Sequence, residues 1–171
     1  MKIHVLSREL LESIISSGKP KTWSGNWALI SISGYLDSGP VINETTSEIL
    51  ASYDCTKILA LCFLDITSNE FPKYQKANPD CDDSFLFNKT HARQILKFVA
   101  NFEDERRLVV QCAAGVSRSG AVGLFLNRYL KLDERKFRKM NSHIEPNDHV
   151  LDVLMRTSGL RDEYVRYWES F

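Results

Sequence analysis

The chain has 171 residues, of which 43% are apolar and 26% charged, so it is long enough to bury one substantial core, and it shows no second block of distinct composition. Its 22 lysines and arginines balance its 22 aspartates and glutamates, so net charge gives no reason to expect nucleic acid or an anionic membrane surface as a partner. The longest apolar run, 58–64, is far shorter than the ~20 residues of a spanning helix, and residues 1–10 lack the apolar centre of a signal peptide.

These properties predict a single soluble, cytoplasmic domain over residues 1–171, expected to be a monomer that binds neither nucleic acid nor membrane. The four cysteines are Cys55, Cys62, Cys81 and Cys112. Their spacing is unlike that of a zinc ribbon, and a domain of this size does not need disulfides to fold. Free thiols in a reducing compartment are therefore expected.

The first half of the chain alternates between strand and helix patterns. Strands are expected at 2–6, 27–32 and 57–65, and the third has the nearly continuous apolar run of a strand covered on both faces. Ser7 can cap a helix that ends near Gly18 and Pro20. Its expected apolar face consists of Leu10, Leu11, Ile14 and Ile15.

Two segments of the first half have loop compositions. Residues 33–44 are rich in Gly, Pro, Ser and Asn, which is typical of a loop. Residues 66–84 are polar, contain two prolines and form the longest stretch without a periodic apolar pattern. Because long loops in compact domains are often functional, a role at the site is expected for the second segment.

The second half continues with an amphipathic helix over 88–102, a strand over 107–112 and a helix over 119–132 that is apolar around most of its circumference and should be buried. The apolar face of the first of these helices consists of Ile95, Leu96, Val99 and Phe102. Outer helices are expected over 133–140, 146–159 and 160–171, with Pro146 starting and Gly159 ending the middle one. This alternation predicts an α/β fold.

The segment VVQCAAGVSRSG, residues 109–120, places a tight loop between a strand and the buried helix. Backbone N–H groups at a helix N-terminus lack intrahelical partners, so such a loop can hold an anion. The expected phosphate-binding residues are those of the loop and its arginine: Ala113, Ala114, Gly115, Val116, Ser117 and Arg118. Gly115 can take the positive φ that a cradle often needs, and Arg118 can grip two phosphate oxygens.

Cys112 lies at the mouth of this cradle, where donors that hold phosphate would also stabilise a thiolate. A thiolate beside a bound phosphoryl group can attack phosphorus and form a cysteinyl-phosphate, while Arg118 and the loop amides stabilise the developing charge. Ser119 is placed to donate a hydrogen bond to the departing sulfur in the second step. The alternative is that Cys112 is an ordinary buried cysteine that ends a strand.

This motif resembles the signature of the cysteine-dependent protein tyrosine and dual-specificity phosphatases, in which a strand leads to His-Cys, five loop residues, Arg and Ser or Thr. Cys112, Arg118 and Ser119 match the nucleophile, the phosphate-binding arginine and the hydroxyl. The order of the segments WALISI, ILALCFLDI, HARQILKFV and HIEPNDHVLDVL extends the resemblance, to compact microbial and viral members, over most of 1–157.

The resemblance implies a single-domain α/β fold with a central, mostly parallel mixed sheet flanked by helices on both faces. Gln111 departs from the family, which has a histidine there that helps to order the loop and activate the thiol. Glutamine can still donate a hydrogen bond.

Hydrolysis of a phosphate ester also needs a proton for the leaving oxygen. The family supplies an aspartate after the strand that neighbours the nucleophile strand, and Asp65 closes the strand 57–65. Asp80, Asp82 and Asp83 are alternatives, because a mobile loop could bring one of them over the site. These three could equally form an acidic cap at a helix N-terminus, and a site without a dedicated acid stays open.

Other candidate residues have two interpretations each. Cys62, expected on the strand beside that of Cys112, could form a protective disulfide with it or be a buried strand residue. A basic group on one helix could dock an acidic substrate or be a solvated face, and consists of Arg135, Lys136, Arg138 and Lys139. Asn147 could orient the loop or cap a helix.

His91, His143 and His149 have no ligand-like spacing with any cysteine, so neither a metal nor another cofactor is expected. The sequence favours a phosphomonoester hydrolase that acts on phosphotyrosine, with phosphoserine and phosphothreonine as further substrates, in proteins or small phosphomonoesters. The loop lacks the lysines common in lipid-directed members of the family. A phosphate-binding pseudophosphatase is the alternative, and arsenate reduction or sulfur transfer is disfavoured because the loop lies far from the N-terminus.

Overall fold

The computed structural model describes residues 1–34, 42–102 and 105–160. A four-stranded sheet in the described residues has the order β1-β4-β2-β3. Its strands are β1 (Lys2–Ser7), β2 (Trp27–Ser33), β3 (Cys55–Cys62) and β4 (Arg107–Cys112). Every pair is parallel, so this sheet is purely parallel rather than mixed, and the expected α/β architecture is otherwise confirmed.

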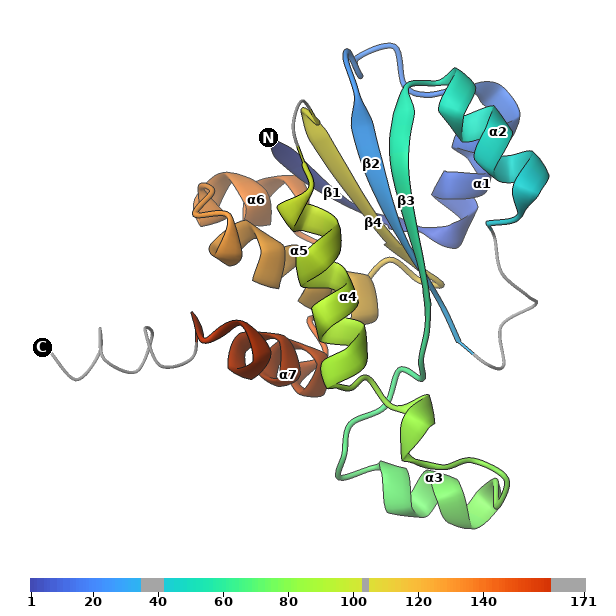
Figure 1. The fold of residues 1–171 in the computed structure, drawn as a ribbon, viewed down its shortest axis with the longest axis vertical. Coiled ribbons are helices and arrows are strands. Elements are labelled where there is room, and N and C mark those ends of the chain that lie inside the picture. The colour runs from blue at the N-terminus through green and yellow to red at the C-terminus, as the bar shows by residue number, and fades with distance from the viewer. Residues whose placement is uncertain (35–41, 103–104, 161–171) are drawn as a thin grey trace, which may run out of the picture.

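Helices cover both faces of the sheet (Figure 1). One face is covered by α1 (Arg8–Ser17) and α2 (Glu44–Ser52), which contribute Leu11, Ile14 and Leu50 to a cluster around Trp27. The other face is covered by α4 (Lys89–Ala100), α5 (Arg118–Tyr129), α6 (Glu134–Met140) and α7 (Asp148–Ser158), which share the larger core. Because side chains alternate along a strand, each strand supplies both cores.

The position of β3 corrects two expectations. It lies at the edge of the sheet and pairs only with β2, so several of its side chains are partly exposed rather than covered on both faces. It is also not adjacent to β4, because β2 lies between them. Only Cys55 and Leu61 are buried in this strand, so its long apolar run does not mark a strand covered on both faces.

Residues 66–84 are less irregular than their composition predicts. They contain α3 (Phe71–Ala77) and lead into a short 3-10 helix, η1 (Asp83–Phe85). These two helices form a lobe that projects beyond the carboxyl end of β3 (Figure 1). Pro72 stands in the first turn of α3, where a missing N–H costs nothing, so this proline begins a helix instead of breaking one.

Three further differences concern local elements. Helix α2 was not predicted; Asn43 caps it, and the only buried side chain in it is that of Leu50, so its periodic signal is weak. Leu10 points to solvent with 55% of its surface exposed, whereas Leu11 and Ile14 are buried as expected. Residues 35–41, most of the expected loop, and 161–171, most of the last expected helix, lie outside the described residues.

The second half of the chain follows its pattern closely. Strand β4 has the predicted bounds, and residues 118–127 of α5 are all buried. Helix α7 is capped by Asn147, so Pro146 precedes the cap, and Gly159 ends the helix with a φ of 78°. Within the described residues, every helix is too short or too polar to cross a lipid bilayer.

Candidate active site

The loop between β4 and α5 closes tightly against the junction of β1 and α1. Gly115 has a φ of 72°, and a Cβ at this position would lie 2.4 Å from the backbone nitrogen of Ser7 and 2.6 Å from the carbonyl carbon of Leu6. The N–H of Arg8 donates to the carbonyl of Ala113 over 3.0 Å. Only glycine fits the position of Gly115, because both the conformation and the space exclude a side chain.

Cys112 lies at the carboxyl end of β4 and is 1% exposed. Its Sγ lies 3.0 Å from Oγ of Ser119, in the first turn of α5, and either atom can be the donor. Ala113 and Ala114 are exposed, whereas the thiol is buried beneath the loop. A nucleophile here would therefore be reached from the loop side, at the helix N-terminus.

The side chain of Arg118 is held by two groups that follow β3. Its Nη1 donates to the carbonyl oxygen of Phe63 over 3.0 Å, and its Nε lies 3.7 Å from Oδ2 of Asp65. Arg118 is 5% exposed, so this ion pair is shielded from solvent on the arginine side. A guanidinium fixed in this way needs little ordering to bind an anion at the loop.

Asp65 receives donors from both neighbouring segments. Oγ of Ser117 donates to Oδ1 of Asp65 over 2.7 Å, and Nδ2 of Asn147 donates to the same oxygen over 3.0 Å. The side chain of Asp65 keeps 37% of its surface exposed. The structure thus brings Asp65 together with Ser117, Arg118 and Asn147, although β3 is not the direct neighbour of β4.

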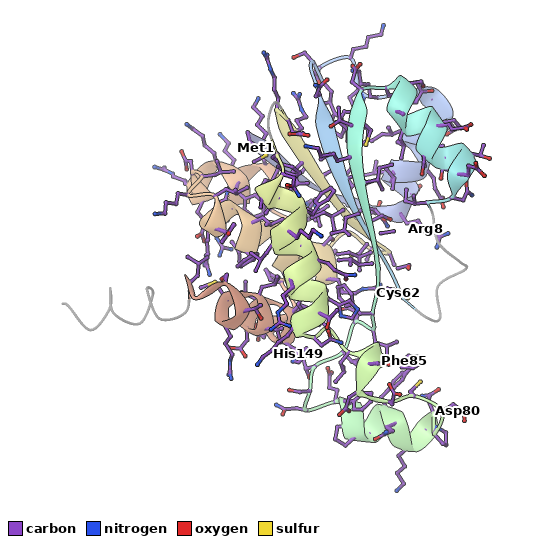
Figure 2. All side chains as sticks on the ribbon, in the orientation of Figure 1. Met1, Arg8, Cys62, Asp80, Phe85 and His149 are labelled. Carbon is purple, nitrogen blue, oxygen red and sulfur yellow. The ribbon has the colours of Figure 1, made fainter. Side chains whose placement is uncertain are left out.

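The three alternative aspartates lie elsewhere. Asp80, labelled in Figure 2, belongs to the lobe of α3 and η1. Asp82 caps η1 through Oδ1, which accepts the N–H of Ser84 over 2.8 Å. Hydrogen bonds from the hydroxyl and the N–H of Ser84 lower the pKa of Asp82, which favours a carboxylate rather than a proton donor. For Asp82, the interpretation as a helix cap is confirmed.

Gln111 and Cys62 both point away from Cys112. Oε1 of Gln111 accepts the hydroxyl of Ser31 on β2 over 2.8 Å, and strand alternation places this pair on the α1 side of the sheet. Cys62 faces the same side, whereas Cys112 belongs to the opposite core. Two strand spacings, about 10 Å, separate the strands of Cys62 and Cys112, which is too far for a disulfide. The hypothesis of a protective disulfide is therefore wrong.

Two of the four basic candidates on α6, and also Asn147, have structural partners. On α6, Arg138 contacts Glu134 over 2.8 Å and Lys136 contacts Asp133 over 3.3 Å, as on a solvated helix face. Asn147 caps α7 through Oδ1, which accepts the N–H of Val150 over 3.1 Å, so its interpretation as a helix cap is confirmed. Its backbone N–H also donates to the carbonyl of Ser117 in the loop over 3.3 Å. In the part of the chain that the structure describes, no group of three or more His, Cys, Asp and Glu side chains could hold a metal ion.

Comparison with known proteins gives structural matches only. No protein-family model matches the sequence, and no curated protein matches it. The chain is similar to the crystal structure of PTPMT1 in complex with PI(5)P, with a TM-score of 0.52 and 12% identity, over 96% of this chain and 94% of that chain. This chain therefore shares the fold of PTPMT1.

Two other solved structures are more distant. Tk-PTP in the active form matches with a TM-score of 0.41 and 12% identity, over 95% of this chain and 92% of that one. Human tyrosine phosphatase-like serine/threonine/tyrosine-interacting protein matches with a TM-score of 0.43 and 14% identity, over 91% and 86% of the two chains. Of these three structures, PTPMT1 has the highest TM-score.

Within this phosphatase-like fold, some residues that shape the site had no sequence signal. The carbonyl of Phe63 holds Arg118 through its backbone, which no residue type reveals. The backbone of Leu6 and Ser7 closes the loop around Gly115, more than a hundred positions away in the chain. Ser117, expected only to line the loop, also donates to Asp65.

Proposed function

We propose that the protein is a phosphomonoester hydrolase that acts on phosphotyrosine through a cysteinyl-phosphate. The observation that supports this most directly is the convergence at one loop of the Cys112 thiol, the Ser119 hydroxyl 3.0 Å away and the Arg118 guanidinium. The fold likeness adds support for the architecture only. Phosphoserine and phosphothreonine are secondary substrates in this proposal.

In the first step, the Cys112 thiolate attacks phosphorus and the bond to the ester oxygen breaks. Asp65 gives its proton to the leaving oxygen, while Arg118 and the N–H groups of residues 113–118 bind the equatorial phosphoryl oxygens. In the second step, Asp65 takes a proton from water, which attacks phosphorus and breaks the bond to sulfur. Ser119 stabilises the departing thiolate with a hydrogen bond across the 3.0 Å contact.

The deciding experiment is hydrolysis of p-nitrophenyl phosphate by the parent protein and by Cys112→Ser. Loss of the nucleophile should lower kcat by at least about a thousandfold, and vanadate should inhibit the parent. Cys62→Ser is the matched control, because Cys62 faces the other side of the sheet. Metal-independent turnover that survives in Cys112→Ser would refute the cysteinyl-phosphate mechanism.

A second candidate function is phosphate-dependent binding without turnover. Gln111 replaces the histidine that the resemblance leads one to expect, and its amide is bonded to Ser31 on the far face of the sheet. The side chain of Gln111 therefore points to the face of the sheet opposite the Cys112 thiol. Phosphotyrosine that competes with vanadate for the parent protein, with no release of phosphate, would favour this function.

A further inference from the structure

A groove runs between α4 and α7 beside the candidate site. Two adjoining cavities of about 430 and 420 Å³ share Lys89, Arg156 and Thr157 in their walls. Lys89 and Arg93 are one helical turn apart on α4, so they lie on the same face of that helix. His149 and Asp152 contribute the wall on the α7 side.

The groove carries an excess of positive charge. Lys89, Arg93 and Arg156 line it together with one carboxylate, Asp152, which lies 2.8 Å from Nε of Arg156. Among the described residues, no carboxylate forms an ion pair with Lys89 or Arg93. The hydroxyl of Thr157 in the wall is buried, and no described residue forms a hydrogen bond with it. The groove thus offers cations to an anionic ligand.

The groove is joined to the candidate site by packed residues. Phe87 lines the groove, and its ring lies 4.8 Å from that of Phe63, whose carbonyl binds Arg118. His149, labelled in Figure 2, contacts the carbonyl of Phe87 over 2.9 Å. It lies two residues beyond Asn147, the donor to Asp65. The wall of the groove thus packs against residues that hold Arg118 and Asp65.

The geometry of α7 gives the distance between the candidate site and the groove. Nine residues separate Asn147 from Arg156 along α7, which corresponds to a rise of about 13 Å. An extended peptide spans about 3.4 Å per residue, so about four residues would cover this distance. We propose that the groove binds acidic side chains of a phosphoprotein substrate, about four residues from the phosphorylated residue. This inference rests on the proposed function and specifies its substrate class.

The test compares phosphopeptide analogues that cannot be hydrolysed. Each carries a phosphonate analogue of phosphotyrosine and two glutamates, placed either next to it or three to five residues away on one side; an alanine peptide is the reference. Fluorescence anisotropy gives Kd for the parent protein. Because exposed charge pairs contribute about 0.2–1 kcal/mol each, the distant glutamates should tighten binding about fivefold.

Charge reversal in the groove should abolish this preference. Lys89→Glu should bind the distant-glutamate peptide no more tightly than the alanine peptide, and Lys89→Glu/Arg93→Glu should bind it more weakly. Lys139→Glu on α6 makes the same charge change outside the groove and should keep the parent's preference. The preference should also shrink in 1 M salt, where the Debye length is about 3 Å.

Several outcomes would overturn the inference. One is equal Kd values for all peptides; another is a preference that Lys139→Glu removes and Lys89→Glu retains, which would move docking to α6. Tight binding to vesicles with phosphorylated inositol lipids, lost in Lys89→Glu and without any peptide preference, would assign the groove to a lipid headgroup. Hydrolysis of p-nitrophenyl phosphate is measured separately, so failure of the proposed function is distinguishable from failure of this inference.

Discussion

At the scale of single residues, the carboxylate of Asp65 has several polar partners in the candidate site. Ser117 and Asn147 donate hydrogen bonds to this carboxylate, and Arg118 forms an ion pair with it. In the proposed reaction, a bound phosphate dianion would compete with Asp65 for the guanidinium of Arg118.

The prediction for Asp65→Asn follows from the proposed role of Asp65 as the proton donor. An amide keeps the size of the side chain but cannot give a proton, so kcat for an alkyl or phenyl phosphate should fall by about 10²–10⁴. For p-nitrophenyl phosphate the loss should be smaller, because its leaving group needs little protonation. In a pH–rate profile, the decline at high pH should disappear.

Asp82→Asn provides the control for this substitution. Asp82 caps η1 in the projecting lobe and should leave the pH–rate profile as it is in the parent. If instead Asp65→Asn preserves the decline at high pH and a variant of Asp80, Asp82 or Asp83 loses it, the acid belongs to the lobe. The lobe would then have to move over the site during the reaction.

At the scale of elements, helix α7 connects stability to the site through Asn147. Its Oδ1 caps the helix at Val150, while its Nδ2 binds Asp65. Asn147→Ala removes both contacts and should cost about 1 kcal/mol of unfolding free energy. Asn147→Ser keeps a capping oxygen and should stay within a few tenths of a kcal/mol of the parent, since serine is an equally good cap.

The two variants separate the two contacts. Urea denaturation should show a loss of stability in Asn147→Ala only, whereas kcat should fall in both, because both lose the amide that holds Asp65. The pH–rate profile should shift in both as well. Retention of the parent's kcat and profile by Asn147→Ser would show that Asn147 acts only as a helix cap.

The elements also show how far the sequence predicts this molecule. Local patterns predict strand β4, the loop and helix α5, because the residues of the motif and of the buried helix follow one another directly in the sequence. The edge position of β3 did not follow, because the order of strands depends on contacts between distant segments. Helix α3 was not predicted, because a proline breaks a helix except in its first turn, and the sequence did not show that Pro72 lies there.

The same distinction applies to the candidate site. Cys112, Arg118 and Ser119 were found because they lie within eight consecutive positions of one motif. The contact of Asp65 with Ser117 joins residues 52 positions apart, and the carbonyl of Phe63 is a backbone group. Spacing cannot reveal either contact, so the sequence alone left Asp65 as one of several candidate acids.

At the scale of the whole molecule, the partly buried His4 links stability in acid to the packing of the sheet. It lies on β1, which neighbours the strand that ends at Cys112, and is in register with Val109. The ring of His4 packs 5.1 Å from that of Trp23, and no described residue forms a hydrogen bond with its buried Nε2. Burial, followed by the charges of Arg107 and Lys2, lowers the pKa of His4 to about 4.

This lowered pKa predicts a loss of stability in mild acid. The unfolded chain binds a proton at His4 near pH 6.5 and the folded protein only near pH 4, so stability is complete above the first value and falls as the pH drops toward the second. Allowing for partial exposure of the ring, the loss between pH 7 and pH 5 should be about 1–2 kcal/mol. Burial also lowers the pKa of His91, which adds to the loss.

Urea denaturation at pH 7 and pH 5 measures this effect in the parent and in His4→Gln. The variant should lose about 1–2 kcal/mol less over this interval, because only the contribution of His4 is removed. His143→Gln is the matched control, since His143 is exposed and should leave the parent's dependence on pH intact. An equal loss in the parent and in His4→Gln would mean that the unfolded and folded chains protonate His4 alike, and the acid sensitivity would then belong to His91 and the carboxylates.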